Sequence, residues 1–375
     1  MKILLATGIY PPESGGPATY TAGLFSELKK RGHDVRVIAY GDPSLKEEGV
    51  TRISRSGGPV VRYLRYAWNV RRLAKDTDVV YAQGPVSEGL PATVATMLLG
   101  KPVVMKVVGD YAWEMAQQHG EKDLLDAFLT KRHHGVIRFY EWAERWTARR
   151  AKRVIVPSKY LKTVVARWSV PEDRIQVIKN SVTSIPGLPV EQQRTETRQR
   201  MGLGDRKVFF TAVRAVPWKG VAELINWWKQ LPSSHVLIVA GDGPELSDWK
   251  ELARQQHVED RIQFLGRVAR QDMGVWYGIA DAFLLHSGYE GYPHVIPEAV
   301  MFGLPCFVSD QGGNPETVGD FPEHVIALPY QDEHAWVAAL SAFSKGRDFS
   351  GMLHAQTENE MWNITEEVLT TYARR

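Results

Sequence analysis

Two glutamates separated by eight positions, Glu290 and Glu298, mark the segment with the strongest chemical signature in this sequence. Glu290 comes shortly after an apolar run, and Pro297 immediately precedes Glu298 at the start of a helical pattern. A proline suits the first position of a helix because its missing N–H would have had no partner there. Glu298 would then lie beside free backbone amides, which attract anions such as a diphosphate. This arrangement would let Glu298 hold ribose hydroxyls and let Glu290 face a sugar.

Taken alone, the pair is more simply explained as an ordinary loop acid and a helix-start acid. Two cations favour a functional interpretation of the glutamates. Arg214 and Lys219 follow another apolar run and precede a second helical pattern. Arginine grips phosphate oxygens in a fork and lysine adds a compact charge, so together they can neutralise a departing diphosphate without a metal ion. Solvated cations at a strand end are the alternative interpretation of these two residues.

Glycine-containing turns follow two more of the apolar runs. Gly241-Asp242-Gly243-Pro244 follows His235–Ala240, and Gly312-Gly313-Asn314-Pro315-Glu316 follows Pro305–Ser309. Glycines allow the backbone to approach a ligand closely. Each turn by itself is more often a simple connection than a binding site.

The elements that must position these residues are short β-branched runs alternating with longer helical patterns, which is typical of parallel sheets covered by helices. In the first half, strands are predicted at Lys2–Ala6, Asp34–Tyr40, Val79–Ala82, Pro102–Val108 and Arg153–Val156. In the second half, they are predicted at Lys207–Val213, His235–Ala240, Arg261–Leu265, Ala282–His286, Pro305–Ser309 and His324–Ala327. Open sheets of this kind bind ligands beyond the carboxyl ends of their strands. The sequence therefore predicts an α/β protein with two Rossmann-like, doubly wound domains that face a central cleft.

The length of 375 residues also favours two domains, since single domains cluster at about 100–150 residues. We expect a first domain at residues 1–183 and a linker at 184–204, where proline, glycine and polar residues replace apolar periodicity. The second domain should occupy residues 205–350. A C-terminal helix is expected at 351–375, crossing back to the first domain.

The composition is that of a globular protein, with 44% hydrophobic and 24% charged residues. A single cysteine, Cys306, excludes an intramolecular disulfide and a thiol cluster for zinc. The amino terminus lacks the core of a signal peptide, and no stretch approaches the roughly 20 apolar residues that cross a bilayer. These features favour a cytoplasmic location.

The net charge of +3 conceals an asymmetry between the halves. Residues 1–180 contain 29 Lys and Arg against 18 Asp and Glu, whereas residues 181–375 contain 17 against 25. We therefore expect the first half of the chain to bind an anionic partner. Two basic, aromatic stretches, Val61–Arg72 and His133–Arg153, are predicted to be helical, and the second has a clear amphipathic pattern. They could bury their apolar faces within the domain, or lie peripherally on the anionic inner face of the plasma membrane.

The order of these motifs resembles a known family. Arg214…Lys219, Gly241-Asp242-Gly243-Pro244, Glu290-x7-Glu298 and Gly312-Gly313-Asn314-Pro315-Glu316 are similar to the carboxy-terminal domain of family 4 retaining glycosyltransferases with the GT-B fold. In the first half, Gly15-Gly16-x3-Tyr20 and Gly32-His33-Asp34-Val35 resemble the family's opening loop and helix. The resemblance spans nearly the whole chain.

The resemblance implies a role for each matching residue. Arg214 and Lys219 would bind the donor diphosphate, Glu298 the nucleotide ribose and Glu290 the donor sugar, with Arg214, Lys219 and Glu290 acting in catalysis. The other positions that it implies for the donor are Gly15, Gly16, Gly241, Gly291, Tyr292, Pro293, Gly312, Gly313 and Asn314. Family members need no divalent metal, so no metal or cofactor is expected beside the nucleoside-diphosphate sugar.

One departure from the family concerns the acceptor. Many members carry a histidine after the fourth strand, where this chain has Gly109. We expect Asp110, Tyr111 and Glu114 to hold acceptor hydroxyls instead, with Asp110 also a catalytic candidate. Solvated loop acids are the alternative.

The resemblance thus implies a metal-independent retaining hexosyltransferase that moves a hexosyl unit from a nucleoside-diphosphate sugar to a hydroxyl of a glycan or lipid-linked acceptor, in envelope polysaccharide or glycolipid biosynthesis. Two other functions remain open, namely a catalytically silent nucleotide-sugar-binding subunit and a nucleotide-sugar epimerase on the same fold. The basic residues match no nucleic-acid-binding module, so no nucleic acid partner is expected.

Overall fold

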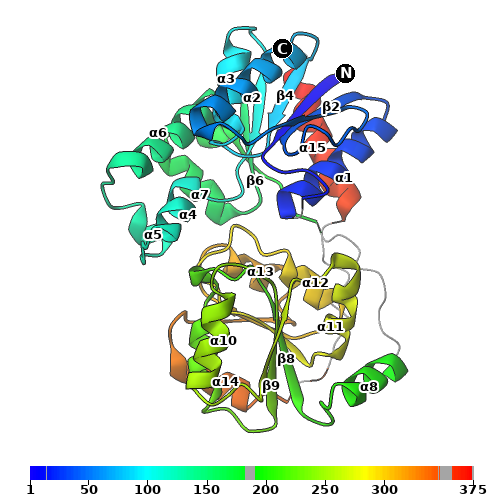
Figure 1. Ribbon diagram of the computed structural model, residues 1–375, viewed down its shortest axis with the longest axis vertical. Helices are drawn as coiled ribbons and strands as arrows, with labels where there is room; N and C mark the ends of the chain where they lie inside the picture. The colour runs from blue at the N-terminus through cyan, green and yellow to red at the C-terminus, as the bar shows by residue number, and fades with distance from the viewer. Residues whose placement is uncertain (14, 182–190, 345, 347–356, 374–375) are drawn as a thin grey trace. The chain divides into compact units, whose positions relative to one another are not determined.

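The computed structural model describes residues 1–13, 15–181, 191–344, 346 and 357–373 (Figure 1). The chain divides into two compact units. The first comprises Met1–Lys179 and Glu358–Arg375, and the second comprises Asn180–Thr357. Each unit is built on one sheet, and the strands of each sheet run parallel.

The sheet of the first unit has seven strands in the order β3-β2-β1-β4-β5-β6-β7. Their bounds are β1 (Lys2–Thr7), β2 (Asp34–Tyr40), β3 (Val50–Ile53), β4 (Val79–Ala82), β5 (Val103–Lys106), β6 (Arg153–Val156) and β7 (Ile175–Val177). All five predicted strands are present. The sequence did not predict β3 and β7 because these edge strands are short and only partly buried, so they lack a continuous apolar run.

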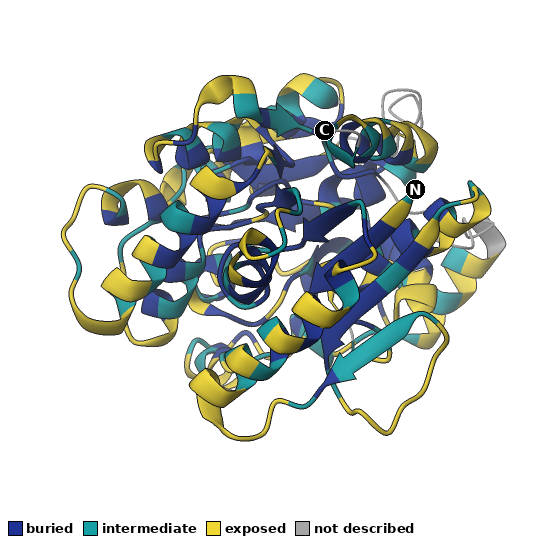
Figure 2. Cartoon of the chain, turned by 90° about the horizontal axis from the view of Figure 1, so that it is seen from above, coloured by how far each residue is buried: buried dark blue, intermediate teal, exposed yellow. Residues whose placement is uncertain are grey.

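Helices cover both faces of this sheet. They are α1 (Gly16–Lys30), α2 (Gly58–Ala74), α3 (Gly89–Met97), α4 (Tyr111–Gln118), α5 (Leu125–Phe128), α6 (Gly135–Arg150), α7 (Lys159–Arg167) and α15 (Glu358–Ala373). Alternate residues of β1 point to opposite faces, so Ile3 packs in the core beneath α1 and α15 and Leu4 in the core beneath α2 and α3. The central strands are buried and the helices expose their outer sides (Figure 2).

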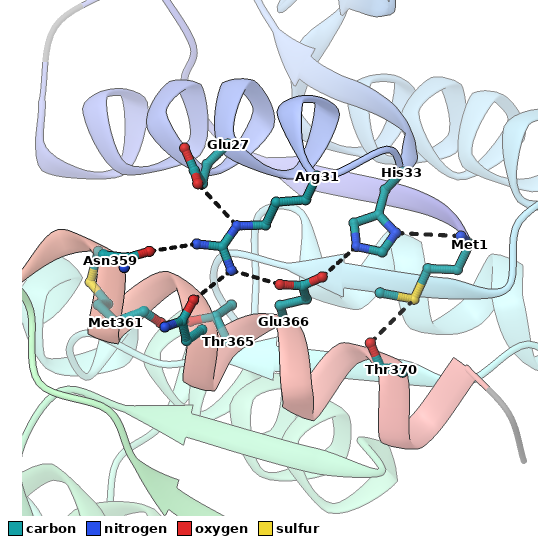
Figure 3. Close-up of polar contacts among 10 residues, drawn as sticks. Met1, Glu27, Arg31, His33, Asn359, Met361, Thr365, Glu366 and Thr370 are labelled. Carbon is teal, nitrogen blue, oxygen red and sulfur yellow. Dashed lines mark hydrogen bonds and ion pairs between the residues drawn. The ribbon is translucent and has the colours of Figure 1, made fainter.

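The C-terminal helix α15 belongs to the first unit, as the sequence predicted. Leu369 is fully buried in the core that α1 and β1 share. Figure 3 shows the polar contacts that add to this packing. Glu366 of α15 accepts hydrogen bonds from Arg31, at 2.7 Å, and from His33, also at 2.7 Å. Both donors follow the end of α1, so α15 is tied to the first helix of the chain.

The sheet of the second unit has six strands in the order β10-β9-β8-β11-β12-β13. Their bounds are β8 (Lys207–Ala212), β9 (His235–Ala240), β10 (Ile262–Gly266), β11 (Ala282–Leu285), β12 (Cys306–Ser309) and β13 (Val325–Leu328), which confirms all six predicted strands. The helices are α8 (Glu191–Arg200), α9 (Val221–Trp228), α10 (Leu246–Gln255), α11 (Met273–Ile279), α12 (Val295–Met301), α13 (Asn314–Asp320) and α14 (Glu333–Ser341).

Neighbouring residues of the central strand β8 contact helices on opposite faces. The ring of Phe209 lies 5.7 Å from that of Trp228 in α9, and the ring of Phe210 lies 5.3 Å from that of Tyr277 in α11. Both sheets are therefore covered on two sides. The predicted pair of Rossmann-like α/β domains is confirmed.

A helix, α8, occupies part of the segment that the sequence predicts as a linker, 184–204. Its sequence lacks an apolar face, which is why no helix was predicted, and arginines hold it instead. Arg198, 9% exposed, donates hydrogen bonds to Ile279 O at 2.8 Å and to the carboxylate of Asp281 at 3.1 Å. Residues 182–190 of the predicted boundary, and 347–356 before α15, lie outside the described part of the chain.

Both sheets reverse the direction of their strand order at one point. β1 lies between β2 and β4, and β8 lies between β9 and β11. The loops that follow these neighbouring strands diverge to opposite faces of the sheet, which leaves space for a ligand at the carboxyl ends. Each unit therefore has one expected binding position, after β1 and β4 in the first and after β8 and β11 in the second.

Candidate functional site

An ion pair lies where the strand order of the second sheet reverses, which we call the switch point of that sheet. Lys219 follows β8, Glu290 follows β11, and Nζ of Lys219 lies 2.5 Å from Oε1 of Glu290. The hydroxyl of Ser287 donates to the same carboxylate oxygen at 2.8 Å. Each side chain of the ion pair is 15% exposed, so both charges are largely withdrawn from solvent yet remain accessible. The structure thus brings together two of the residues that the sequence singled out.

Backbone contacts hold the two loops together. Lys219 ends a 3₁₀ turn, Pro217–Lys219, and Gly220 follows with a φ of 64°. The N–H of Gly288 donates to Trp218 O at 2.8 Å, which joins the loop after β11 to the turn. A Cβ atom at Gly220 would lie 1.8 Å from the carbonyl oxygen of His286. Only glycine fits there, so the position of Lys219 depends on this close approach.

A buried histidine, to which the sequence assigned no chemistry, supports the same turn. His286 is 1% exposed, and its Nδ1 lies 3.0 Å from Gly220 O. Burial lowers the pKa of His286 to about 4, so the ring is neutral at neutral pH and Nδ1 donates to the carbonyl oxygen. Its ring stacks on Tyr330 at 4.7 Å. His286 is therefore a structural support of the Lys219 turn.

The predicted glycines bring neighbouring loops into contact with one another. A Cβ atom at Gly241 would lie 1.7 Å from Val213 O, and one at Gly313 would lie 2.4 Å from Gly291 O. The N–H of Gly313 also donates to Glu290 O at 2.8 Å. Gly312 and Gly313 thus fix the backbone that carries Glu290. The sequence did not predict this structural role of the two glycines.

Two other predicted donor residues use their side chains within the unit. Asn314 is fully buried and donates from Nδ2 to the hydroxyl of Ser309 at 2.9 Å, and its Oδ1 has no hydrogen-bond partner among the described residues. The hydroxyl of Tyr292 donates to Asp320 at 2.8 Å. Pro293 is buried beside Tyr292. These side chains shape the loops around Glu290.

Glu298 lies in the first turn of α12, which begins at Val295, two residues earlier than Pro297 predicted. Proline is tolerated throughout the first turn because none of its amides has an intrahelical partner. The carboxylate, in a residue 5% exposed, accepts hydrogen bonds from Arg270 Nη1 at 2.9 Å and from the Tyr277 hydroxyl at 3.0 Å. Burial raises the pKa of Glu298, whereas these partners oppose that rise.

Arg270 contacts the predicted donor residue Glu298, although the sequence did not predict Arg270 itself. It begins a 3₁₀ turn, Arg270–Asp272, and no motif marks it. Its side chain is 42% exposed, while the Glu298 side chain that it contacts is 7% exposed. Arg214 is exposed beside the Lys219 turn, and its side chain makes no hydrogen bond or ion pair with another described residue. The second unit therefore presents two cations, Arg214 and Arg270, near its buried carboxylates.

The predicted acceptor residues lie in the first unit, after β5. Asp110 is 1% exposed and caps α4 by accepting a hydrogen bond from the N–H of Trp113 at 2.8 Å. Burial raises its pKa to about 6. A second buried carboxylate, Glu144, accepts from the backbone N–H groups of Tyr111 and Ala112. Asp110 is thus a helix cap here, not a solvated loop acid, and its predicted role toward an acceptor stays a prediction.

Glu114 and Tyr111 are half-buried on α4. Gly15 and Gly16 lie in the first unit as well, where α1 begins at Gly16. An added Cβ at Gly16 would meet no atom within 4 Å. The structure therefore gathers Lys219, Glu290 and the surrounding glycines in one unit and places the acceptor candidates and Gly15-Gly16 in the other. The predicted contact of Gly15-Gly16 with a donor phosphate stays a prediction.

Family models of known proteins match both halves of the chain. The model of the glycosyl transferase 4-like domain matches residues 15–181, and that of glycosyl transferases group 1 matches residues 193–360. The chain therefore belongs to the group 1 glycosyltransferases, with a family 4 type of first domain.

Two relatives illustrate the range of the family. GDP-mannose-dependent alpha-(1-6)-phosphatidylinositol monomannoside mannosyltransferase of Mycolicibacterium smegmatis is 26% identical over 85% of this chain and 83% of its own. Alpha-monoglucosyldiacylglycerol synthase of Streptococcus pneumoniae is 24% identical over 91% of this chain and 77% of its own.

Solved structures share the fold. Anabaena Alr3699/HepE in complex with UDP and glucose has a TM-score of 0.74 at 19% identity and covers 100% of this chain and 97% of its own. WaaG, a glycosyltransferase involved in lipopolysaccharide biosynthesis, has a TM-score of 0.66 at 20% identity, with 100% and 95% covered. These similarities confirm the GT-B fold.

None of the described helices is both long enough and apolar enough to span a lipid bilayer. The described residues also contain no group of three or more His, Cys, Asp or Glu side chains arranged to hold a metal ion.

Proposed function

We propose that this glycosyltransferase transfers a hexosyl unit from a nucleoside-diphosphate sugar to an acceptor hydroxyl, with retention of the anomeric configuration and without a metal ion. The observation that carries the proposal is the pair of Lys219 and Glu290 at the switch point of the second sheet. Arg214 adds an exposed cation on the same loop as Lys219. The complexes of Anabaena Alr3699/HepE with UDP and with UDP and glucose support a nucleotide-sugar donor on this fold.

The proposed reaction breaks the bond between the anomeric carbon and the diphosphate and forms a bond to the acceptor oxygen on the same face of the sugar. The proton of the acceptor hydroxyl passes to the departing diphosphate oxygen, so no nucleophile from the protein is needed. Lys219 and Arg214 stabilise the negative charge that develops on the diphosphate. Glu290 holds Lys219 in place before the donor binds and faces the sugar, where a carboxylate stabilises positive charge at the anomeric carbon.

Glu298 is proposed to hold the ribose of the donor. Its two oxygens are already oriented by Arg270 and Tyr277, and oriented carboxylate oxygens accept hydrogen bonds from neighbouring hydroxyl groups. The side chain of Arg270 is exposed enough to contact the nucleotide as well.

The acceptor is proposed to be a glycan or a lipid-linked sugar. The two relatives described above are named for phosphatidylinositol monomannoside and for monoglucosyldiacylglycerol, and a third, from Escherichia coli, is named for a diphosphoundecaprenol-linked sugar. Membrane-embedded acceptors of this kind would require the enzyme to reach a lipid surface.

The first unit has an exposed apolar and basic surface suited to that purpose. We define the α2–α3–α6 surface by its exposed apolar residues, which are Val60, Val61, Leu64, Trp68, Val94, Met97, Leu98, Val136, Phe139 and Trp142. The helix α3 contacts both α2 and α6. Exposed arginines flank the surface at Arg71, Arg72, Arg138, Arg149 and Arg150. Apolar side chains beside cations match an anionic membrane, and we propose that the enzyme docks there peripherally.

Incubation with donor and acceptor tests the proposed reaction. We expect wild-type protein to bind one nucleotide sugar in a thermal-shift screen and to form a glycosylated product only with an acceptor present, with the anomeric configuration kept by NMR and activity retained in EDTA. A donor at 100 times its dissociation constant should stabilise the protein by about 2.7 kcal/mol. Conversion of the donor without an acceptor would instead identify an epimerase, and binding without transfer across an acceptor panel would identify a silent subunit.

A further inference from the structure

A buried carboxyl group lies at the other switch point, in the first unit. Glu88 follows β4, and the residue is 7% exposed. A Cβ atom at Gly84 would lie 2.6 Å from Oε1 of Glu88, and one at Gly8 would lie 3.2 Å from Oε2. Gly8 follows β1 and Gly84 follows β4, so the carboxyl group lies where the strand order reverses. This is the position at which an open α/β sheet binds its ligand.

The carboxyl group of Glu88 is not used by the fold. Glu88 occupies the N-cap position of α3, yet its side chain does not cap the helix. Within the described chain its only hydrogen bond comes from its own backbone N–H. Burial raises the pKa of Glu88 to about 7. No other described residue donates a hydrogen bond to this carboxyl group, so it remains available to a hydroxyl supplied by a ligand.

Aromatic and polar side chains gather around Ser87, the residue that precedes Glu88. The hydroxyl of Tyr40 donates to Ser87 O at 2.8 Å. The side chain of Ser87 acts to lower the pKa of both Tyr63 and Tyr111, so it lies close to their hydroxyl groups. The guanidinium of Arg62 lies 5.4 Å from the ring of Tyr40 and 5.2 Å from that of Tyr63. Its Nε is buried and has no hydrogen-bond partner among the described residues.

The chemistry of this group of side chains fits a sugar ring. Apolar C–H faces of a pyranose pack on aromatic rings, and its hydroxyls both donate and accept hydrogen bonds. Partners for each are offered by the tyrosines, of which Tyr40 is buried and Tyr63 and Tyr111 are half-buried, and by a serine hydroxyl, a guanidinium and a carboxyl group. A carboxylate disfavours a diphosphate, because like charges repel at short range. The first unit therefore suits the acceptor sugar better than the donor diphosphate.

We propose that the Glu88 cluster, defined by Tyr40, Arg62, Tyr63, Ser87, Glu88 and Tyr111, binds a sugar ring of the acceptor, with Glu88 hydrogen-bonded to one of its hydroxyls. The inference rests on the proposed function, because it assigns the acceptor of that same reaction to a named set of residues. Tyr111 was an acceptor candidate from the sequence, whereas Glu88 was not, because no motif marks it.

Steady-state kinetics of Glu88→Ala and Glu88→Gln test the proposal. Loss of one hydrogen bond to a buried group changes a rate or an affinity by about 5- to 150-fold. We expect Glu88→Ala to lower kcat/KM for the acceptor within that range. Its dissociation constant for the donor, and its slow hydrolysis of the donor without acceptor, should stay within about twofold of wild type. Glu88→Gln keeps the shape and the hydrogen-bonding atoms, so it should recover most of the loss.

The same measurements contain the results that would overturn the proposal. Wild-type kcat/KM for the acceptor in Glu88→Ala would do so, as would an equal loss of donor hydrolysis, which would indicate a structural role. If Glu88→Ala does not fold, Ser87→Ala and Tyr111→Phe carry the test, with the same split between acceptor and donor parameters expected. Failure of the proposed function itself is distinguishable, because wild-type protein would then transfer no sugar to any acceptor.

Discussion

Nζ of Lys219 lies 2.5 Å from Oε1 of Glu290, although 71 positions separate the two residues in the chain. The two belong to loops that follow the adjacent central strands β8 and β11. Ser287 donates to the same oxygen of Glu290, and the N–H of Gly313 donates to its carbonyl oxygen. Glu290 is therefore fixed through both its side chain and its backbone, and it in turn fixes Lys219.

Replacement of Lys219 by alanine should abolish transfer in a folded protein. The change removes a cation that stabilises the departing diphosphate and leaves Glu290 without its cationic partner, so kcat should fall by at least about a hundredfold. Glu290→Ala should have the same effect. Lys229→Ala, which removes an exposed lysine at the end of α9, is the matched control and should retain activity. Wild-type turnover in Lys219→Ala or Glu290→Ala would refute the assignment.

Gly313→Ala should disturb the site without touching a charged group. The new methyl group would lie 2.4 Å from Gly291 O, so the loop that carries Glu290 must move. Overpacking of this kind costs about 1–3 kcal/mol. Thermal unfolding and donor titration should show lower stability and weaker donor binding. Gly319→Ala in α13 is the control, since its Cβ would meet no atom within 4 Å and alanine favours a helix. Equal behaviour of the two variants would show that the close approach is unimportant.

The sequence predicted the strands of both sheets well because fully buried parallel strands form continuous apolar runs, as in Val79–Ala82 and Ala282–Leu285. It predicted Glu290, Lys219 and the glycine turns because each follows such a run. Arg270 and Glu88 were missed because their roles depend on contacts that the fold creates. α8 was missed because arginines, not an apolar face, anchor it.

Arg270→Ala should weaken donor binding and lower stability together. Arg270 donates to Glu298 at 2.9 Å. Removal of the guanidinium leaves a residue that is 5% exposed, with the Tyr277 hydroxyl as the remaining side-chain donor to its carboxylate among the described residues. Burial already raises the pKa of Glu298, so loss of the cation should raise that pKa further. Donor binding should be titrated at a series of falling pH values. As the pH falls, the variant should lose donor binding at a higher pH than wild type does. Identical pH profiles would contradict a coupling between Arg270 and Glu298.

The contacts of α15 predict how stability of the first unit depends on acidity. Burial acts to raise the pKa of Glu366, but hydrogen bonds from His33 and Arg31 outweigh it and lower the pKa below the ordinary value of 4.5. A depressed folded-state pKa means that the stabilisation is present above about pH 4.5 and is lost as the pH falls through the folded-state value. Glu366→Gln should therefore unfold at a lower temperature than wild type at pH 7, and the difference should shrink toward pH 3. A constant difference across that range would exclude the ion pair as its cause.

Membrane docking through the α2–α3–α6 surface predicts that exposed apolar side chains matter for lipid binding but not for folding. Trp68 is 62% exposed and Leu64 is 66% exposed on α2. Burial of a large apolar side chain contributes about 1.5–3 kcal/mol, so the double variant Leu64→Ser and Trp68→Ser should bind anionic vesicles at least about tenfold more weakly. Its unfolding temperature should match wild type, because neither side chain is buried in the core.

The matched control is Ile326→Ser, which replaces an apolar residue of the second unit that is 47% exposed. This variant should bind vesicles as wild type does. Cosedimentation with phosphatidylglycerol vesicles measures both, and because the arginines contribute electrostatically, wild-type binding should weaken as salt is raised. Binding by the double variant equal to that of wild type, or no binding by wild type at low salt, would rule out this surface.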